Sequence, residues 1–135
     1  MALQLSVAVR NAMLDAIETA IGTSAVLKIR TGAPPASVAT ADSGTVLATL
    51  TLPSDWLAAG SSGSKAKSGT WEDASADSAG TAGHYRIYAS DGTTAHLQGT
   101  VTATGGGGDL VVDNTVFAAG QSFTVTSWSL TAANS

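Results

Sequence analysis

The stretch that decides the fold is His84-Tyr85-Arg86-Ile87-Tyr88-Ala89, followed after a turn by Thr94-Ala95-His96-Leu97-Gln98-Gly99-Thr100-Val101-Thr102. Apolar and polar residues alternate along both segments, as they do in β-strands that bury one face. The residues between them, Ser90-Asp91-Gly92, predict a three-residue hairpin loop. That loop would place Tyr85 opposite Leu97 and Arg86 opposite His96, a register that keeps the apolar side chains together.

Short strands and glycine-rich turns continue on both sides of this hairpin. Strands are expected over residues 25–31, 45–52, 69–72, 84–89, 94–102, 109–112, 115–118 and 122–131. About eight strands at this spacing predict a mainly β fold, a jelly-roll-like antiparallel β-sandwich. Residues 58–67 are rich in Ser, Gly and Ala and are expected to be a mobile loop or to become ordered only by contact.

Residues 6–21 predict one N-terminal α-helix, with Ser6 as N-cap and Gly22 as C-cap. Its apolar stripe consists of Leu14, Ile17 and Ile21, with Val9 and Met13 beside them. The polar residues Arg10, Asn11, Asp15 and Glu18 fall largely on the other face. The helix could pack on its own domain or dock on a neighbouring subunit. We therefore divide the chain into a helix or arm at residues 1–22 and a β-sandwich domain at residues 23–135.

The amino-acid composition argues against several classes of protein. The charged fraction is 12%, against about 25% in average proteins, and the net charge is −4. This balance argues against a nucleic-acid partner, which usually needs a basic stripe. There is no cysteine, no apolar run near the length of a membrane span and no basic region typical of a signal peptide. A weakly charged surface suits a subunit that packs closely in an assembly.

The residues that could carry chemistry do not form a recognisable catalytic or metal motif. Gly105-Gly106-Gly107-Gly108 lacks the Lys-Ser/Thr and the helix of a phosphate loop, and is interpreted as a strand connector. His84 and His96 lack a third ligand and are expected to be surface histidines. The acids Glu72, Asp73 and Asp77 lack the spacing of a calcium loop. We expect no catalytic residue, no enzyme activity, no metal and no cofactor.

The aromatic residues leave two interpretations open. Trp56, Trp71, Tyr85, Tyr88 and Trp128 could form a carbohydrate-binding platform. Aromatic residues this sparse in a small β-domain are more often in the core or at an interface. A carbohydrate-binding β-sandwich module is therefore kept as an alternative of another class.

Four motifs along the chain are Leu3-Gln4-Leu5-Ser6 followed by Arg10-Asn11-Ala12, Thr51-Leu52-Pro53-Ser54-Asp55-Trp56, Gly83-His84-Tyr85-Arg86-Ile87-Tyr88, and the run from Gly99 to Gly108. With these motifs the chain resembles a small virion structural protein of tailed bacteriophages. The resemblance covers nearly the full length. It implies a capsid decoration, or cement, protein with a jelly-roll domain that bridges major capsid subunits. A tail or neck (connector) subunit is the alternative within this class.

The expected partners follow from this resemblance. They are the major capsid protein and further copies of the chain, as a dimer or trimer, with no nucleic acid, membrane or small-molecule substrate. The chain would be made in the host cytoplasm and located on the capsid surface of the virion. The candidate interface residues are Leu14, Ile17, Trp56, Lys28, Arg30 and Arg86.

Overall fold

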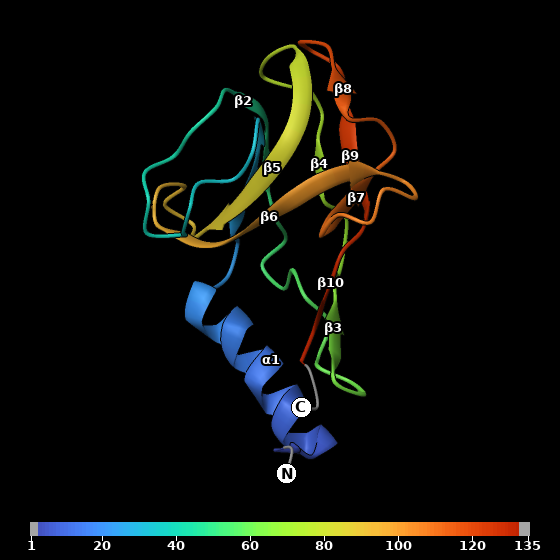
Figure 1. Ribbon diagram of the computed structural model, residues 1–135. Helices are drawn as coiled ribbons and strands as arrows, with labels where there is room; N and C mark the ends of the chain where they lie inside the picture. Colours follow the sequence, from blue (N-terminus) through green and yellow to red (C-terminus); the bar gives the residue numbers. More distant parts are fainter. Residues whose placement is uncertain (1–2, 133–135) are drawn as a thin grey trace.

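The computed structural model describes residues 3–132 and shows a mainly β chain with one N-terminal helix (Figure 1). The elements are α1 (Val7–Ile21), β1 (Val26–Thr31), β2 (Val46–Thr51), β3 (Ser64–Ala66), β4 (Glu72–Asp73), β5 (Gly80–Tyr88), β6 (Ala95–Ala103), β7 (Leu110–Val112), β8 (Val116–Phe117), β9 (Phe123–Ser127) and β10 (Ser129–Thr131). The predicted fold class, mainly β with one N-terminal helix, is confirmed.

Eight strands form one sheet that nearly closes on itself. The strand order is β2-β1-β5-β6-β7-β9-β4, and β8 also pairs with β5. The two edge strands of the sheet, β2 and β4, are joined through a side chain. The Thr49 amide in β2 donates a hydrogen bond to Asp73 Oδ2 in β4 at 3.0 Å. The Asp77 amide donates to the Leu47 carbonyl at 2.8 Å on the same side. These contacts protect edges that would otherwise be open to pairing with another chain.

One pair of strands is parallel. Val101 in β6 lies opposite Leu110 in β7, although only a short loop joins the two strands. The four-glycine run makes this return possible, because Gly105 and Gly107 adopt positive φ angles of 87° and 78°. The Gly108 amide donates to Thr102 Oγ1 at 2.9 Å, which fastens the returning chain to β6. The run is a tight connector between strands.

The register of the central hairpin differs from the predicted one. Ile87 lies opposite Leu97, and Tyr85 lies opposite Gly99. The predicted pairing was wrong by two residues because the turn is longer and a bulge follows Ile87. The Asp91 carboxylate stabilises this longer turn by accepting from the amides of Thr93 and Thr94. A side chain at Gly99 would also clash, since its Cβ would lie 2.7 Å from Tyr85 Cε1.

The predicted loop at residues 58–67 contains a strand, β3, which pairs with β10 in a separate two-stranded sheet. Lys65 at its centre lies opposite Leu130 and is only 1% exposed. Of the two expectations for this segment, a mobile loop or order gained by contact, the structure agrees with the second for this part. Small residues gave no strand signal, and the order comes from contacts with β10 and α1.

Three tryptophans form the centre of the core where the large sheet, the small sheet and the end of α1 meet. The ring centroids of Trp56, Trp71 and Trp128 lie 5.5–6.4 Å apart. Each indole N–H has an acceptor: the Gly22 carbonyl for Trp56, the Ser68 carbonyl for Trp71 and the hydroxyl of Tyr85 for Trp128. The cluster therefore fixes the C-terminal end of α1 against the β-body without leaving a buried donor unpaired.

Candidate functional site

Helix α1 turns its polar side chains toward its own chain. It begins after Ser6, whose hydroxyl accepts from the Val9 amide, and it ends at Gly22, as predicted. The expectation that the polar residues lie on the face away from the packed stripe is wrong, because four of them bind the neighbouring backbone. Asn11 Oδ1 accepts from Gly63 N, Asp15 Oδ1 from Gly60 N and Glu18 Oε2 from Leu57 N, while Arg10 Nη1 donates to the Ala132 carbonyl.

The buried Lys65 strengthens this attachment. Its ammonium group lies 2.7 Å from Asp15 Oδ1 and 3.1 Å from Glu18 Oε1. Burial alone would lower the pKa of Lys65, but the hydrogen bonds to Asp15 and Glu18 outweigh it and raise that pKa. The hydrogen bond from Lys65 in turn lowers the pKa of Asp15. The helix is therefore held by ion pairs and hydrogen bonds as well as by the buried side chains of Leu14 and Ile21.

The opposite face of α1 is exposed and carries no charge. We call this surface the outer face; it consists of Ala8, Val9, Ala12, Met13, Ala16, Thr19 and Ala20. Val9 is 46% exposed and Met13 is 50% exposed, which are high values for large apolar side chains. An exposed helix of a monomeric protein usually shows charged residues here. The outer face is therefore the strongest candidate for a contact surface in the described chain.

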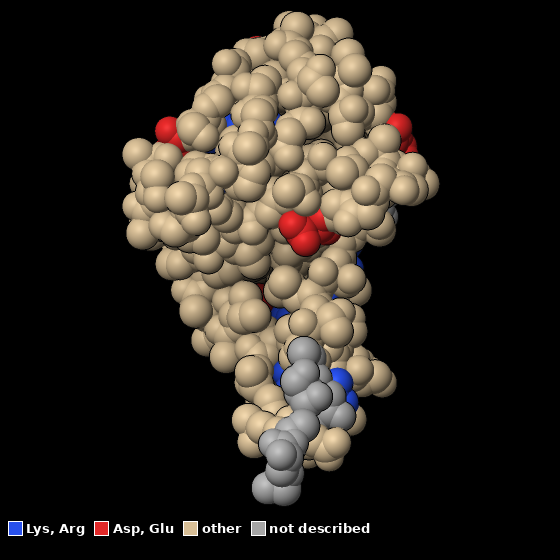
Figure 2. All heavy atoms as spheres, in the orientation of Figure 1, with Lys and Arg blue, Asp and Glu red and all other residues tan. Residues whose placement is uncertain are grey.

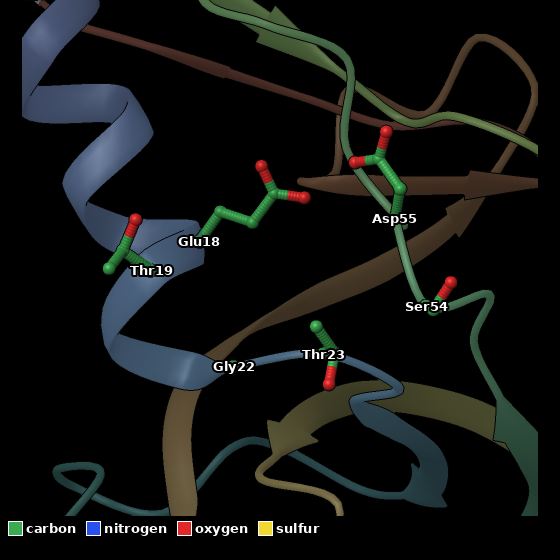
Figure 3. Close-up of a pocket in the computed structure, with 6 residues that line it drawn as sticks. All are labelled: Glu18, Thr19, Gly22, Thr23, Ser54 and Asp55. Carbon is green, nitrogen blue, oxygen red and sulfur yellow. The ribbon is translucent and has the colours of Figure 1, made fainter.

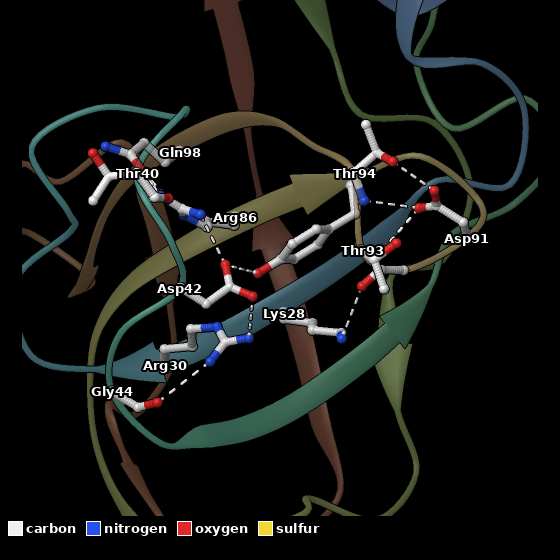
Figure 4. A network of polar contacts seen from close by, with 12 residues as sticks. Lys28, Arg30, Thr40, Asp42, Gly44, Arg86, Asp91, Thr93, Thr94 and Gln98 are labelled. Carbon is white, nitrogen blue, oxygen red and sulfur yellow. Dashed lines mark hydrogen bonds and ion pairs between the residues drawn. The ribbon is translucent and has the colours of Figure 1, made fainter.

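A second polar cluster lies on the outside of the large sheet (Figure 4). We call it the Asp42 network. Asp42 accepts hydrogen bonds from Arg30 Nη2 at 2.9 Å, Arg86 Nη1 at 2.8 Å and Tyr88 Oη at 2.8 Å. Arg86 also donates to Gln98 and to the carbonyls of Ser37 and Thr40.

The Asp42 network folds the loop of residues 32–44 over strands β1 and β5. Partial burial would raise the pKa of Asp42, but the hydrogen bond from Tyr88 and the two guanidinium groups outweigh it and hold that pKa below its ordinary value. Arg86 is 2% exposed, so its charge is inside the protein. The Asp42 network has a structural role: it holds the loop of residues 32–44 against the second face of the central strands.

Most of the candidate interface residues lie inside the chain. Leu14, Trp56, Arg30 and Arg86 are buried, and Ile17 and Lys28 are half-buried. Lys28 Nζ donates to the Gly92 carbonyl at 2.9 Å and lies over the Tyr88 ring. The four buried side chains therefore do not form an accessible surface. Sequence reasoning placed Val9 and Met13 beside the packed stripe, but the structure exposes both, and no signal in the sequence distinguishes them from packed apolar residues.

Two shallow hollows on the surface have the size of a small-ligand site. One, of about 370 Å³, lies where Glu18 on α1 faces the loop carrying Ser54 and Asp55 (Figure 3). Glu18 is already bonded to Lys65 and to the Leu57 amide. The other, of about 400 Å³, is lined in part by Tyr85 and Asp109, and Asp109 Oδ2 already accepts from the Thr100 amide. Neither hollow presents a convergent set of free polar groups.

The histidines and acids do not converge either. His84 is buried, and its Nδ1 lies 2.9 Å from the Gly32 carbonyl, so the expectation of a surface histidine is wrong for His84. His96 is exposed on β6. Asp73 and Asp77 bind Thr49 and so join strand β2 to its neighbours. Among residues 3–132, no group of three or more His, Asp or Glu side chains could hold a metal ion.

The five aromatic residues considered for carbohydrate binding are all buried. Trp56, Trp71 and Tyr88 have no exposed surface, and Tyr85 and Trp128 are 2% and 4% exposed. They are therefore core residues, and none offers a ring face on which a sugar could stack. No helix in the described part of the chain has the length and hydropathy needed to cross a membrane.

Comparison with known proteins adds no relative. No family model matches the chain, and no curated protein and no solved structure matches it.

Proposed function

We propose that this protein is a non-enzymatic structural subunit of a bacteriophage particle, a capsid decoration protein that binds and stabilises the major capsid shell. One observation carries the assembly role: an uncharged, apolar helix face is exposed while the polar side chains of the same helix point inward. Burial of this face against another protein would be favourable, because it would remove apolar side chains from water. The resemblance of the sequence to phage virion proteins supports the capsid as the setting.

The surface is suited to close packing. Charged side chains are sparse on the face shown in Figure 2, where most of the surface is uncharged. Close approach to a neighbour therefore requires little desolvation of charge. A decoration protein is present in many copies, and weak contacts that act together give strong attachment. The fastened loop of residues 32–44 and the fixed helix also reduce the conformational entropy lost on binding.

The copy number of the protein in purified particles tests this proposal. Quantitative mass spectrometry of particles that carry the chain should find hundreds of copies. Six or twelve copies would support a tail or neck subunit, and absence from the particle would overturn both. For a shell protein held by packing, most copies should stay bound in about 0.5 M NaCl, where the Debye length falls to a few Å. Release by salt of folded protein would instead indicate a contact held by charge.

A further inference from the structure

We infer that the free edge of strand β10 binds an extended, positively charged segment of another protein as an additional β-strand. Pairing of backbone groups along a sheet edge is a recurrent way in which proteins recognise extended peptides. The inference adds a binding site to the surface described on α1. That the partner is a virion protein rests on the proposed function, whereas the binding of a basic strand does not.

Within residues 3–132, one edge of β10 has no strand beside it. Hydrogen-bonded and non-hydrogen-bonded positions alternate along an antiparallel pair. Trp128 is a hydrogen-bonded position next to β3, because its carbonyl accepts from the Lys67 amide at 3.0 Å. The N–H and C=O groups of Ser129 and Thr131 therefore point away from β3. Both residues are exposed, and neither backbone has a hydrogen-bond partner in the described chain.

The edge is free because β7 stops short of β10. β3 and β4 follow one side of β10 and β9, and β7 follows the other side of β9 but begins only at Leu110. The residues before it are attached to β6 instead. The Gly108 amide donates to Thr102 Oγ1, and the Asp109 carboxylate accepts from the Thr100 amide. An incoming strand can therefore take the ladder position that β7 leaves open beside β10.

This position opens into the hollow of about 400 Å³. Leu97 and Leu130 give it apolar walls that can receive a side chain of the incoming strand. Tyr85, which is 2% exposed, also lines it. Its hydroxyl accepts from Trp128 Nε1, and no acceptor for the hydroxyl proton is present among residues 3–132. A row of backbone groups beside such a hollow suits an extended chain rather than a compact small molecule.

Asp109 sets the charge of the partner. Among the described residues that line the hollow, Asp109 alone is charged, and it is exposed. Its Oδ2 accepts from the amide and the hydroxyl of Thr100, whereas its Oδ1 has no partner in the described chain. Opposite charges on neighbouring strands stabilise their pairing. A Lys or Arg on the incoming strand therefore complements this edge, and the net charge of −4 favours the same partner.

A second copy of the chain does not supply that charge. The chain has six basic residues, and each is already bonded within its own molecule. Two of them pair with Asp42, one with Asp15, and three donate to backbone carbonyls. The six are Arg30, Arg86, Lys65, Arg10, Lys28 and Lys67. The partner is therefore a different protein.

NMR spectroscopy of the isotope-labelled full chain tests the inference. In the free protein, the Ser129 and Thr131 amides should exchange with deuterium much faster than the Leu130 amide, which faces β3. The probe is the peptide Thr-Lys-Val-Lys-Val-Lys-Thr, which should shift the Ser129 and Thr131 amide signals with a dissociation constant of about 0.1–1 mM. Two control peptides separate charge from backbone pairing. Replacing Lys by Glu should weaken binding at least about fivefold, and N-methylation of the five central amides should abolish it.

Variants of the edge give matched controls. Thr131→Pro removes one N–H from the free edge, where proline is tolerated, and should raise the dissociation constant at least about tenfold. Thr131→Ala keeps that N–H and should bind like wild type. Asp109→Asn should weaken binding of the lysine peptide about two- to fivefold, and Asp113→Asn, at another exposed position, should not. Circular dichroism should show that all four variants stay folded.

The outcomes separate this inference from the proposed function. No shift of the Ser129 and Thr131 signals, or equal binding by Thr131→Pro and Thr131→Ala, would overturn the inference. Equal binding of the lysine and glutamate peptides would overturn the basic partner. If the peptide binds as expected but the protein is absent from purified particles, the strand site stands and the proposed function fails. If particles hold hundreds of copies but no peptide binds, the proposed function stands and the inference fails.

Discussion

The ammonium group of Lys65 lies 2.7 Å from Asp15 Oδ1, so a buried strand residue is joined to a helix residue fifty positions earlier. With Glu18, this pair helps to hold the polar side of α1 against the β-body. Lys65→Met should lower the free energy of unfolding by about 1–3 kcal/mol, because it leaves two carboxylates without their cation. Urea denaturation checks this. Lys67→Met, which removes a partly exposed lysine, should change stability by less than about 1 kcal/mol. Equal losses in the two variants would show that the pair does not hold the helix.

The Asp42 network should respond strongly to loss of its one carboxylate. Asp42→Asn keeps the shape of the side chain but leaves the buried Arg86 guanidinium without a counter-charge. We expect a loss of about 2–4 kcal/mol in unfolding free energy, below the full value for a buried pair because Asp42 is partly exposed. Asp113→Asn, a substitution at an exposed loop position, is the control. A melting temperature unchanged from wild type would contradict the assigned role.

The stability of the protein should fall in acid. Asp42 and Asp15 have pKa values below the ordinary 3.8 in the folded protein. The stabilisation from such groups is present above the unfolded pKa and is lost as the pH falls through the lower folded value. Melting temperatures measured from pH 7 to pH 2 should therefore decline below about pH 4. The decline should be smaller in Asp42→Asn, and an identical slope in both proteins would argue against this assignment.

The Tyr85 hydroxyl should ionise only at high pH, and its ionisation should lower the stability of the folded protein. Burial is the main reason that the pKa of Tyr85 rises to about 12. Because the folded state holds this proton more tightly, its contribution to stability is present below the unfolded pKa of about 10 and is lost as the pH rises toward 12. Absorbance titration near 295 nm should show this late ionisation, and titration of Tyr85 near pH 10 in folded protein would contradict it.

Tyr85→Phe should destabilise the fold at neutral pH. The Trp128 indole N–H donates to the Tyr85 hydroxyl at 2.8 Å, and the substitution leaves this donor buried without an acceptor. The expected loss is about 1–3 kcal/mol in chemical denaturation. In a protein that already carries Trp128→Phe, the added Tyr85→Phe change should cost less, since no donor remains. An equal cost in both backgrounds would place the effect elsewhere.

Gly99→Ala should also be destabilising. The new Cβ would lie 2.7 Å from Tyr85 Cε1 and 2.8 Å from Asp109 Oδ2, so the ring or the strand must move. Overpacking of this kind costs about 1–3 kcal/mol. Gly105→Ala is the comparison, because its Cβ meets no atom within 4 Å and only its positive φ opposes the change. Wild-type stability in Gly99→Ala would mean that the strand accommodates a Cβ at this position without strain.

Some features of this protein are set by local sequence. The helix is limited to Val7–Ile21 because the caps Ser6 and Gly22 satisfy backbone groups of the helix termini within a few residues. The strands around Ile29, Leu50 and Ile87 follow from alternation, which is also a short-range signal. The mainly β class and the single helix could therefore be predicted without a structure.

Other features were decided only by tertiary structure. The inner face of α1 is polar because Gly60, Gly63 and Leu57 bring backbone N–H groups that need acceptors, and no local pattern announces partners about forty to fifty residues away. Arg86 is buried because the loop of residues 32–44 carries Asp42 back over the sheet. Charge in a sequence normally predicts exposure, but a buried charge is stable when distant partners neutralise it. The outer face of α1 is exposed because the opposite face of the helix is the one that contacts the rest of the chain.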